Sequence, residues 1–287
     1  MRQTTVVGFV AGVGIAMTSL TSAQVSPPNR AGVAMGHLHF HVRDVEANQK
    51  FWVALGGTPA RALGMARVVK FPGLLIVLSP GESSGTTEGS VVNHLALRVK
   101  TFAQIETAGL KVERRSIEGR QSGTVVSPSG DRVELFEENA EQTRFKLDAG
   151  WTDAVANRHN EPLTAPVVPH HLHLDVPQDA DAVAQAWYVK IFGGVPGTRL
   201  RYQATDLPGM NFNFSGYAMP MAPTKGRTLD HIGFEVRNLQ AFCKTLAADG
   251  VKLDQAYATH DDGVATALLT DPWGTSIELT EGLSRWQ

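Results

Sequence analysis

Four segments of the chain share one pattern of hydrophobic and polar positions. Each segment opens with a histidine, continues as a short strand with alternating or continuous apolar positions, and then changes to helical spacing. The segments are HLHFHVRDVEANQKFW from His37, HLALRVKTFAQIETAG from His94, HLHLDVPQDADAVAQAW from His171 and HIGFEVRNLQAFCKTL from His231. Strand-like runs follow each helix. The pattern therefore predicts four copies of one unit, each made of a strand, a helix and two or three further strands.

The spacing of the units predicts two similar halves. His37 and His94 are 57 residues apart, His171 and His231 are 60 apart, and the first and third units repeat most closely, at 134 residues. We therefore expect consecutive units to pair into two domains. The expected boundaries are an N-terminal tail at 24–34, a first domain at 35–138, a linker at 139–167 and a second domain at 168–287.

The N-terminus has the pattern of a secretory signal peptide over residues 1–23. Arg2 is followed by the apolar run VVGFVAGVGIAMTSL and by the small residues TSA before Gln24. A run of about 15 residues is short for a membrane span, although an uncleaved anchor is the alternative interpretation. We expect a periplasmic or secreted protein without stable membrane association after signal cleavage.

Charge and cysteine content exclude several classes of protein. The formal net charge of −2, without a basic stripe, argues against a nucleic-acid partner. The single cysteine, Cys243, excludes an internal disulfide and a multi-cysteine metal site, and its helical position indicates a buried small side chain. The sequence leaves the oligomeric state open, with a homodimer as one option.

Two units end in the same turn and strand. SPSGDRVEL carries Glu134 and DPWGTSIEL carries Glu278, and both have the pattern P-x-G-x-x-x-E-L. A glutamate between apolar strand neighbours is unfavourable unless it is paired or bound to a ligand. We therefore predict two metal sites, one in each half, with these ligand sets: His37, His94 and Glu134; His171, His231 and Glu278.

Two histidines and one carboxylate form a facial triad that leaves coordination positions open for a substrate. This ligand set favours Fe(II) as the cofactor, while Mn, Ni, Co or Zn are alternatives. His39 and His173 follow the first ligand of each half by two residues, so they face the same side of the strand. We expect both to face the cavity, with His173 as the first candidate for acid–base catalysis. His41 has no counterpart in the second half and is interpreted as a polar residue near the end of its strand.

These repeated units, with DVEANQKFWVALGG and DPWGTSIELTE, resemble the vicinal oxygen chelate superfamily. It includes glyoxalase I, bleomycin-resistance proteins, fosfomycin-modifying enzymes and extradiol ring-cleaving dioxygenases. The resemblance covers about residues 35–138 and 168–283. It implies an α+β fold of four βαβββ modules paired into two domains, each a curved mixed sheet around a cavity. It also implies a divalent metal that chelates two adjacent oxygens of a small-molecule substrate.

The resemblance is most specific toward extradiol dioxygenases. The runs LLIVLSP and MNFNFSG lack the additional carboxylate that glyoxalase I-like sites use, and His260 stands 18 residues before Glu278, as in the extradiol pattern. We expect a catalytic role for His260, with a solvated loop position as the alternative. Leu268 occupies the position of the extradiol tyrosine, for which Tyr202 or Tyr257 could substitute. The expected function is an exported, divalent-metal-dependent, extradiol-like dioxygenase. The alternatives are a glyoxalase-like lyase or isomerase, and a metal-free binding or resistance protein.

Overall fold

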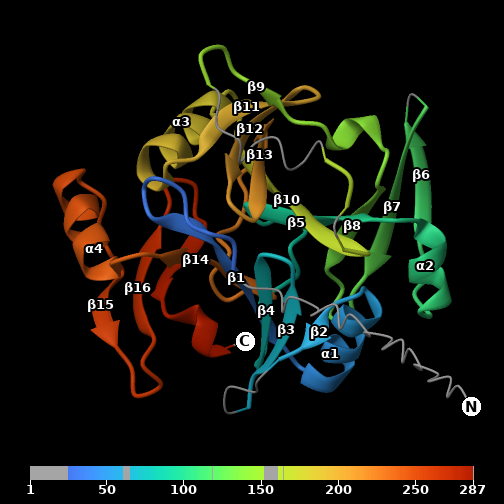
Figure 1. The fold of residues 1–287 in the computed structure, drawn as a ribbon, viewed down its shortest axis with the longest axis horizontal. Helices are drawn as coiled ribbons and strands as arrows, with labels where there is room; N and C mark the ends of the chain where they lie inside the picture. Colours follow the sequence, from blue (N-terminus) through green and yellow to red (C-terminus); the bar gives the residue numbers. More distant parts are fainter. Residues whose placement is uncertain (1–24, 61–64, 118, 152–160, 164, 287) are drawn as a thin grey trace, which may run out of the picture.

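The computed structural model describes residues 25–60, 65–117, 119–151, 161–163 and 165–286, which form two mixed β-sheets with four α-helices (Figure 1). The predicted signal peptide lies outside the described residues. The fold confirms the prediction of paired βαβββ modules in an α+β chain. None of the helices among the described residues is long and apolar enough to cross a membrane.

The first sheet combines the first and fourth units. Its strand order is β15-β16-β17-β14-β1-β4-β3-β2. The strands are β1 (Val33–Val42), β2 (Thr58–Pro59), β3 (Arg67–Phe71), β4 (Leu74–Pro80), β14 (Leu229–Val236), β15 (Gln255–Thr259), β16 (Ala265–Thr270) and β17 (Ser276–Glu281). The antiparallel pair of β1 and β14 joins the two units, and each of these strands also has a parallel neighbour, β4 and β17.

The second sheet combines the second and third units in the order β6-β7-β8-β5-β10-β13-β12-β11-β9. Its strands are β5 (Val92–Val99), β6 (Glu113–Ile117), β7 (Arg120–Val126), β8 (Arg132–Glu137), β9 (Lys146–Leu147), β10 (Val167–Pro177), β11 (Val195–Arg199), β12 (Tyr202–Leu207) and β13 (Met210–Tyr217). The antiparallel pair of β5 and β10 joins its two units in the same way. The expected linker is not only a connection, because its β9 pairs with β11.

Our prediction that consecutive units pair is wrong for both sheets. The segment after β4 (residues 81–91) leaves the first sheet for the second, and the segment after β13 (218–228) returns. These two crossing segments lie side by side and are hydrogen bonded. Thr228 N donates to Gly85 O at 2.9 Å, Ala222 N to Gly89 O at 2.9 Å and Val91 N to Ala222 O at 3.0 Å. Their mutual hydrogen bonds hold the crossed arrangement, in which the boundaries at 138 and 168 fall within the second sheet.

One continuous hydrophobic core joins the helix-covered faces of both sheets. The helices are α1 (Val45–Ala54), α2 (Phe102–Thr107), α3 (Asp181–Phe192) and α4 (Leu239–Ala248). In the strands, Leu38, Phe40, Leu172 and Leu174 point into this core, and Cys243 is buried in it, as expected. The histidines between those leucines and phenylalanine occupy the alternate positions and therefore face the other side. We call that side, turned away from the helices, the inner face of each sheet.

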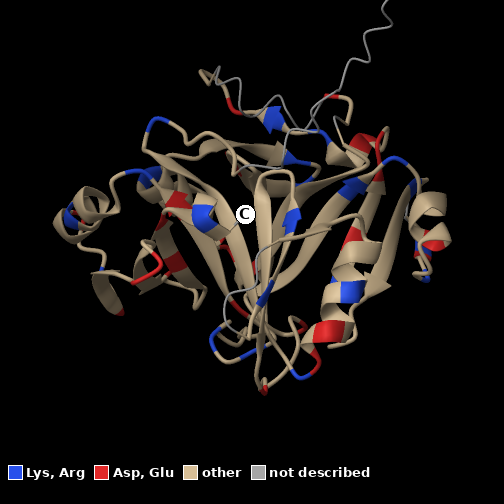
Figure 2. Ribbon diagram, turned by 60° about the horizontal axis from the view of Figure 1, so that its bottom comes forward, with Lys and Arg blue, Asp and Glu red and all other residues tan. Residues whose placement is uncertain are grey.

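Carboxylates accept hydrogen bonds from backbone N–H groups at the N-termini of two helices, α1 and α4. Asp44 caps α1 by accepting a hydrogen bond from Ala47 N at 2.8 Å. Asn238 stands before α4 in a left-handed conformation and makes no side-chain cap bond. Glu281 replaces it, because its carboxylate accepts from Asn238 N and Leu239 N at 3.0 and 3.1 Å. Elsewhere on the ribbon, Lys and Arg are interspersed with Asp and Glu (Figure 2).

Candidate metal centres

The first centre lies on the inner face of the first sheet, where β1, β14 and β17 are neighbours. His37 Nε2 is 3.0 Å from Glu278 Oε2, and His231 Nε2 is 3.5 Å from the same oxygen. His37 is fully buried, whereas the Glu278 side chain is 15% exposed. The His37 ring lies directly over Gly233, the residue that pairs with His37 on β14. Three residues from three strands therefore converge on one point.

A carboxylate network surrounds the imidazole of His231. Asp230 Oδ1 is 2.7 Å from His231 Nδ1. Burial by itself lowers the pKa of His231, but the carboxylates of Asp230 and Glu278 outweigh it and raise the pKa to about 9. The pKa of Glu278 is lowered by its two histidine neighbours, which outweigh its own burial. His41 Nδ1 is 3.7 Å from Asp230 Oδ2 near the end of β1, in agreement with its expected polar position. Without a metal, His231 carries a proton at neutral pH.

The surroundings of the first centre on β3 and β4 are apolar. Ala66, Val68, Leu75 and Val77 form a buried cluster with Leu283. The C-terminal 3₁₀ helix that holds Leu283 also places the Trp286 ring 5.7 Å from that of His37. The cluster and the C-terminal helix thus cover the first centre.

The second centre repeats this arrangement on the inner face of the second sheet, where β5, β8 and β10 are neighbours. His94 Nε2 is 3.2 Å from Glu134 Oε2, and His171 Nε2 is 3.9 Å from the same oxygen. The Glu134 side chain is 26% exposed. Asn93 here takes the place of Asp230, with its Oδ1 2.7 Å from His94 Nδ1. The neighbour of this histidine is therefore a neutral amide.

Behind His171 lies a buried polar group on the same sheet. His170 Nδ1 is 2.8 Å from His171 Nδ1, and Arg199 Nη1 donates to His170 Nδ1 at 3.2 Å. Burial lowers the pKa of His171 well below its usual value, and its neighbours His170 and Arg199 lower it further. Because that pKa is low, His171 is neutral at pH 7 and offers a free lone pair. The sequence did not direct attention to His170 or Arg199.

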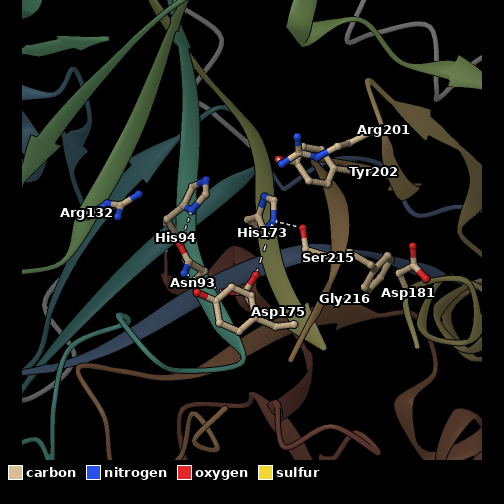
Figure 3. A pocket seen from close by; sticks show the side chains of 12 residues that line it. Asn93, His94, Arg132, His173, Asp175, Asp181, Arg201, Tyr202, Ser215 and Gly216 are labelled. Carbon is tan, nitrogen blue, oxygen red and sulfur yellow. Dashed lines mark hydrogen bonds and ion pairs between the residues drawn. The ribbon is translucent and has the colours of Figure 1, made fainter. Parts of the chain in front are cut away.

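A cavity of about 490 Å³ opens beside the second centre (Figure 3). Its wall includes His94, His173, Asp175 and Ser215. His173 Nε2 is 2.7 Å from Ser215 Oγ, and burial together with its positive neighbours lowers the pKa of His173 well below its usual value. Asp175 Oδ1 lies 3.8 Å from the same nitrogen. His173 therefore faces the cavity, as predicted, as a neutral imidazole in contact with a hydroxyl.

The first sheet has an equivalent histidine–serine pair. His39 Nε2 is 2.7 Å from Ser79 Oγ, and burial followed by the charge of His231 lowers the pKa of His39 to about 3. Ser79 and Ser215 stand at equivalent positions of β4 and β13, yet the sequence alone did not single them out. The signal that could have found them is the repeated run ending in Ser, LLIVLS and MNFNFS.

All six predicted ligands lie in the two centres, but the predicted sets are wrong. We expected His37 with His94 and Glu134, whereas His37 lies with His231 and Glu278. Likewise, we expected His171 with His231 and Glu278, whereas it lies with His94 and Glu134. The reason is the crossed pairing of units, which places the opening strand of one half beside the closing strands of the other half.

The donor atoms fit a divalent metal. Ligands in neighbouring positions around a metal with bonds of about 2.1 Å lie about 3 Å from one another. The carboxylate–imidazole distances of 3.0 to 3.9 Å in the two centres are close to this spacing. In addition, Nδ1 of the buried His37 lacks a hydrogen-bond partner among the residues that the structure describes, and its Nε2 faces the Glu278 carboxylate at 3.0 Å. A buried histidine with an unsatisfied nitrogen is stabilised by a ligand at that position.

The strand register identifies a fourth position in each centre. On β17, Glu278 lies two residues after the position that is level with His231 on the neighbouring strand β14. On β8, Glu134 lies two residues after the position that is level with His94 on β5. On the parallel neighbours of the opening strands, the residues two beyond the positions level with His37 and His171 are Val77 of β4 and Asn213 of β13. These two residues pair with His39 and His173. Asn213 is buried, and its Oδ1 has no hydrogen-bond partner within the described part of the chain. Neither run therefore adds a carboxylate to its centre, whereas His39 and His173 bring a further imidazole nitrogen within 4.8 Å of the other two histidines.

The remaining candidate catalytic residues differ in their distance from the two centres. His260 is exposed on the β15–β16 hairpin, where its Nε2 bonds Thr266 Oγ1 at 2.7 Å, and it contacts neither centre among the described residues. The alternative interpretation, a solvated loop position, describes it better than a catalytic role. Leu268 pairs with Glu278, so no tyrosine lies opposite that ligand. Tyr202 does face the second centre, since its ring lies 4.9 Å from that of His173, edge to face.

Comparisons with known proteins agree with this architecture. Glyoxalase I from Zea mays has a TM-score of 0.61 at 15% sequence identity, over 88% of this chain and 93% of that one. A proposed dioxygenase from Bacillus subtilis subsp. subtilis str. 168 gives 0.60 at 14% identity, over 91% and 88%. A search of curated protein sequences finds no match. The family model of the Glyoxalase/Bleomycin resistance protein/Dioxygenase superfamily matches residues 34–279, and the chain therefore belongs to this superfamily.

Proposed function

We propose that the chain is a divalent-metal-dependent enzyme that acts on a small molecule with two adjacent oxygens, and that His94, His171 and Glu134 form its working centre. The observation that carries this assignment is the cavity of about 490 Å³ beside His94 and His173. The corresponding inner face of the first sheet is covered by Leu283 and its apolar neighbours. Both centres have the donor atoms, but the second centre also has a cavity beside it that can hold a substrate.

The reaction class that best suits this centre is an extradiol-like dioxygenase reaction. Two histidines and one glutamate, without a further carboxylate at Asn213, form the ligand set typical of non-haem Fe(II) enzymes. A metal bound there would supply Lewis-acid stabilisation of charge on the substrate oxygens, and Fe(II) would add redox chemistry toward O2. A glyoxalase-like lyase or isomerase, with Zn or Ni, is the alternative.

The protein's own groups prepare the substrate for this chemistry. His173 is neutral at pH 7 because burial and its positive neighbours lower its pKa. Its ring therefore has a lone pair that can accept a hydrogen bond from a substrate hydroxyl and take the proton once metal binding has made that hydroxyl more acidic. Ser215 Oγ, at 2.7 Å from His173 Nε2, can pass that proton toward the cavity mouth. Tyr202 packs edge-on against the His173 ring and fixes its orientation. His173 is therefore the acid–base group in this proposal, with Ser215 as its relay.

The test compares the two centres directly. Protein purified without oxygen is analysed for metal, and O2 uptake is measured with catechol-type compounds. Glu134→Ala should abolish uptake by more than about 100-fold, because loss of a ligand exceeds the effect of losing an outer-shell partner. Glu278→Ala is the matched control and should keep most of the activity. Zn or Ni without O2 consumption would favour the lyase or isomerase, and activity lost only in Glu278→Ala would move the working centre to the first sheet.

We further propose that the protein is exported and that residues 1–23 are removed. The supporting pattern is the basic start, apolar run and small-residue site before Gln24. Mass spectrometry of the protein from a periplasmic or secreted fraction should give a chain that begins at Gln24. A full-length chain retained in the membrane fraction would contradict the proposal.

A further inference from the structure

Two arginines face the cavity of the second centre from different sides. Arg132 stands on β8 two residues before Glu134, on the same face of the strand, and lies on the His94 side of the cavity (Figure 3). Arg201 lies in the turn between β11 and β12, on the other side of His173. Its guanidinium is 5.1 Å from the centre of the Tyr202 ring, and its Nη2 donates to Tyr202 Oη at 3.2 Å. Tyr202 therefore holds the Arg201 guanidinium in place at the cavity wall.

Neither of these two groups forms an ion pair among the described residues, although Arg132 interacts with Asp175 at longer range. The cavity has two acidic side chains, and neither serves this purpose. Asp175 accepts a hydrogen bond from Asn93 Nδ2 at 2.9 Å and lies beside His173. Asp181 stands in the first turn of α3, where the helix dipole favours a negative charge.

The first centre lacks both arginines at the equivalent positions. Two residues before Glu278 stands Ser276, where the second centre has Arg132. Val77 pairs with Val68 and Asn213 pairs with Ala204, so Ala66 is the counterpart of Tyr202. Met65, which precedes Ala66, takes the place of Arg201. The charged wall is therefore a property of the second cavity rather than of the repeated unit.

We propose that this cavity binds a carboxylic acid that also carries two adjacent oxygens, and that Arg201 binds its carboxylate. A guanidinium can offer two parallel N–H groups to a carboxylate, and Arg201 keeps N–H groups beyond the one that bonds Tyr202. Arg132, on the His94 side, adds a second positive charge that favours an anionic substrate. The proposal rests on the proposed function for the position of the adjacent oxygens, which would face His94, His171 and Glu134. The carboxylate site itself rests on Arg201, Tyr202 and Arg132 alone.

The test uses two probes that differ only in the carboxylate, catechol and 3,4-dihydroxybenzoate. Both are titrated into Co(II)-loaded Glu278→Ala protein without oxygen, and binding is followed by calorimetry and by the visible Co(II) spectrum. The carboxylate should tighten binding by about tenfold or more, as expected for hydrogen bonds to charged groups. Arg201→Met keeps the aliphatic stem and should remove this preference, measured as the ratio of the two affinities within the same variant. Arg237→Met, at an exposed arginine in the turn after β14, is the matched control and should keep the preference.

The outcomes separate this proposal from the proposed function. If the protein binds Co(II) and catechol but shows no carboxylate preference, or if Arg201→Met retains the preference, the carboxylate site is wrong and the metal centre stands. If Co(II) does not bind at the second centre, the proposed function fails. Benzoate titrated into metal-free protein then decides the carboxylate site by itself. Binding that Arg201→Met abolishes would support it, and no binding would overturn it.

Discussion

The two inner faces hold the same three ligand types in different surroundings. In the first centre an aspartate, Asp230, contacts the histidine of the fourth unit, while Val77 occupies the fourth position. In the second centre the corresponding residues are two amides, Asn93 and Asn213. The first centre is covered by the C-terminal helix, whereas the second adjoins a polar cavity.

This difference shows which parts of a duplicated site can change independently. The candidate ligands project from the central strands and from β8 or β17, so we expect a change in any of them to remove a donor atom from its centre. The residues that surround the ligands come from β4 and β13, from the strands beside these two, and from Asp230 and Asn93, which precede His231 and His94. Substitutions there alter charge, access and proton affinity without removing a donor atom. The chain thus has one ligand set in two chemical environments, and the following predictions test how far the environments differ.

The largest expected effect comes from Gly233→Ala in the first centre. A Cβ at this position would clash with the His37 ring, which would have to leave its present place beside Glu278. The second centre already has a Cβ at the matching place, because Ala96 pairs with His171. We expect Gly233→Ala to weaken metal binding at the first centre by more than about 100-fold, and overpacking to destabilise the fold by about 1–3 kcal/mol.

Metal stoichiometry and urea denaturation measure these two effects. Ala96→Gly is the control, which removes the corresponding Cβ from the second centre and should leave its metal bound. Two metals per chain with unchanged affinities in Gly233→Ala would show that His37 is not a ligand.

The next effect is a difference in pH dependence between the centres. In the metal-free chain the pKa of His231 is raised to about 9, so a metal must displace its proton at pH 7. Metal affinity at the first centre should therefore rise about tenfold per pH unit up to about pH 9. The stability that the raised pKa gives the metal-free fold is complete below about pH 6.5 and is lost as the pH rises through 9. His171 in the second centre is already neutral and releases no such proton.

Competition titrations with Co(II) between pH 6.5 and 8.5 test this contrast. Glu134→Ala isolates the first centre, and Glu278→Ala isolates the second. Asp230→Asn gives the first centre the amide that Asn93 provides in the second, so it should lower the pKa of His231 and flatten the pH dependence. Equal slopes at both centres in the parent variants would contradict the assignment of a protonated His231.

The six candidate ligands could be picked out from the sequence because their positions depend on local patterns. A histidine that opens each strand and a glutamate after a Pro–Gly turn are visible without tertiary information, and all six predicted ligands lie in the centres. The pairing of units was not visible, because any opening strand of the type HLHxxV can pair with either HLALRV or HIGFEV. The deciding contacts are hydrogen bonds between the crossing segments 81–91 and 218–228, which are far apart in the sequence.

The surroundings were also hidden, for a different physical reason. Arg132 and Arg201 are 69 positions apart in the sequence and meet at one cavity only because β8 and β12 belong to the same sheet. Likewise, His260 had the expected spacing from Glu278, but the β15–β16 hairpin extends it into solvent. Spacing along the chain constrains residues on one strand well, and residues on a hairpin at the sheet edge poorly.

The smallest predicted effect concerns the fourth position of each centre, in metal-free protein. Val77 is packed against Val68 and Leu75, so Val77→Asn would bury an amide among apolar side chains and should cost about 1–3 kcal/mol in the free energy of unfolding. Asn213 is already buried with an unpaired Oδ1, so Asn213→Val removes an unsatisfied group and should be neutral or stabilising. Urea denaturation of both variants with a chelator present measures the difference. If Asn213→Val instead destabilises the metal-free chain as strongly as Val77→Asn does, the Asn213 amide is part of a polar network that holds β13 in place. The second inner face would then depend on that network for stability as well as for binding.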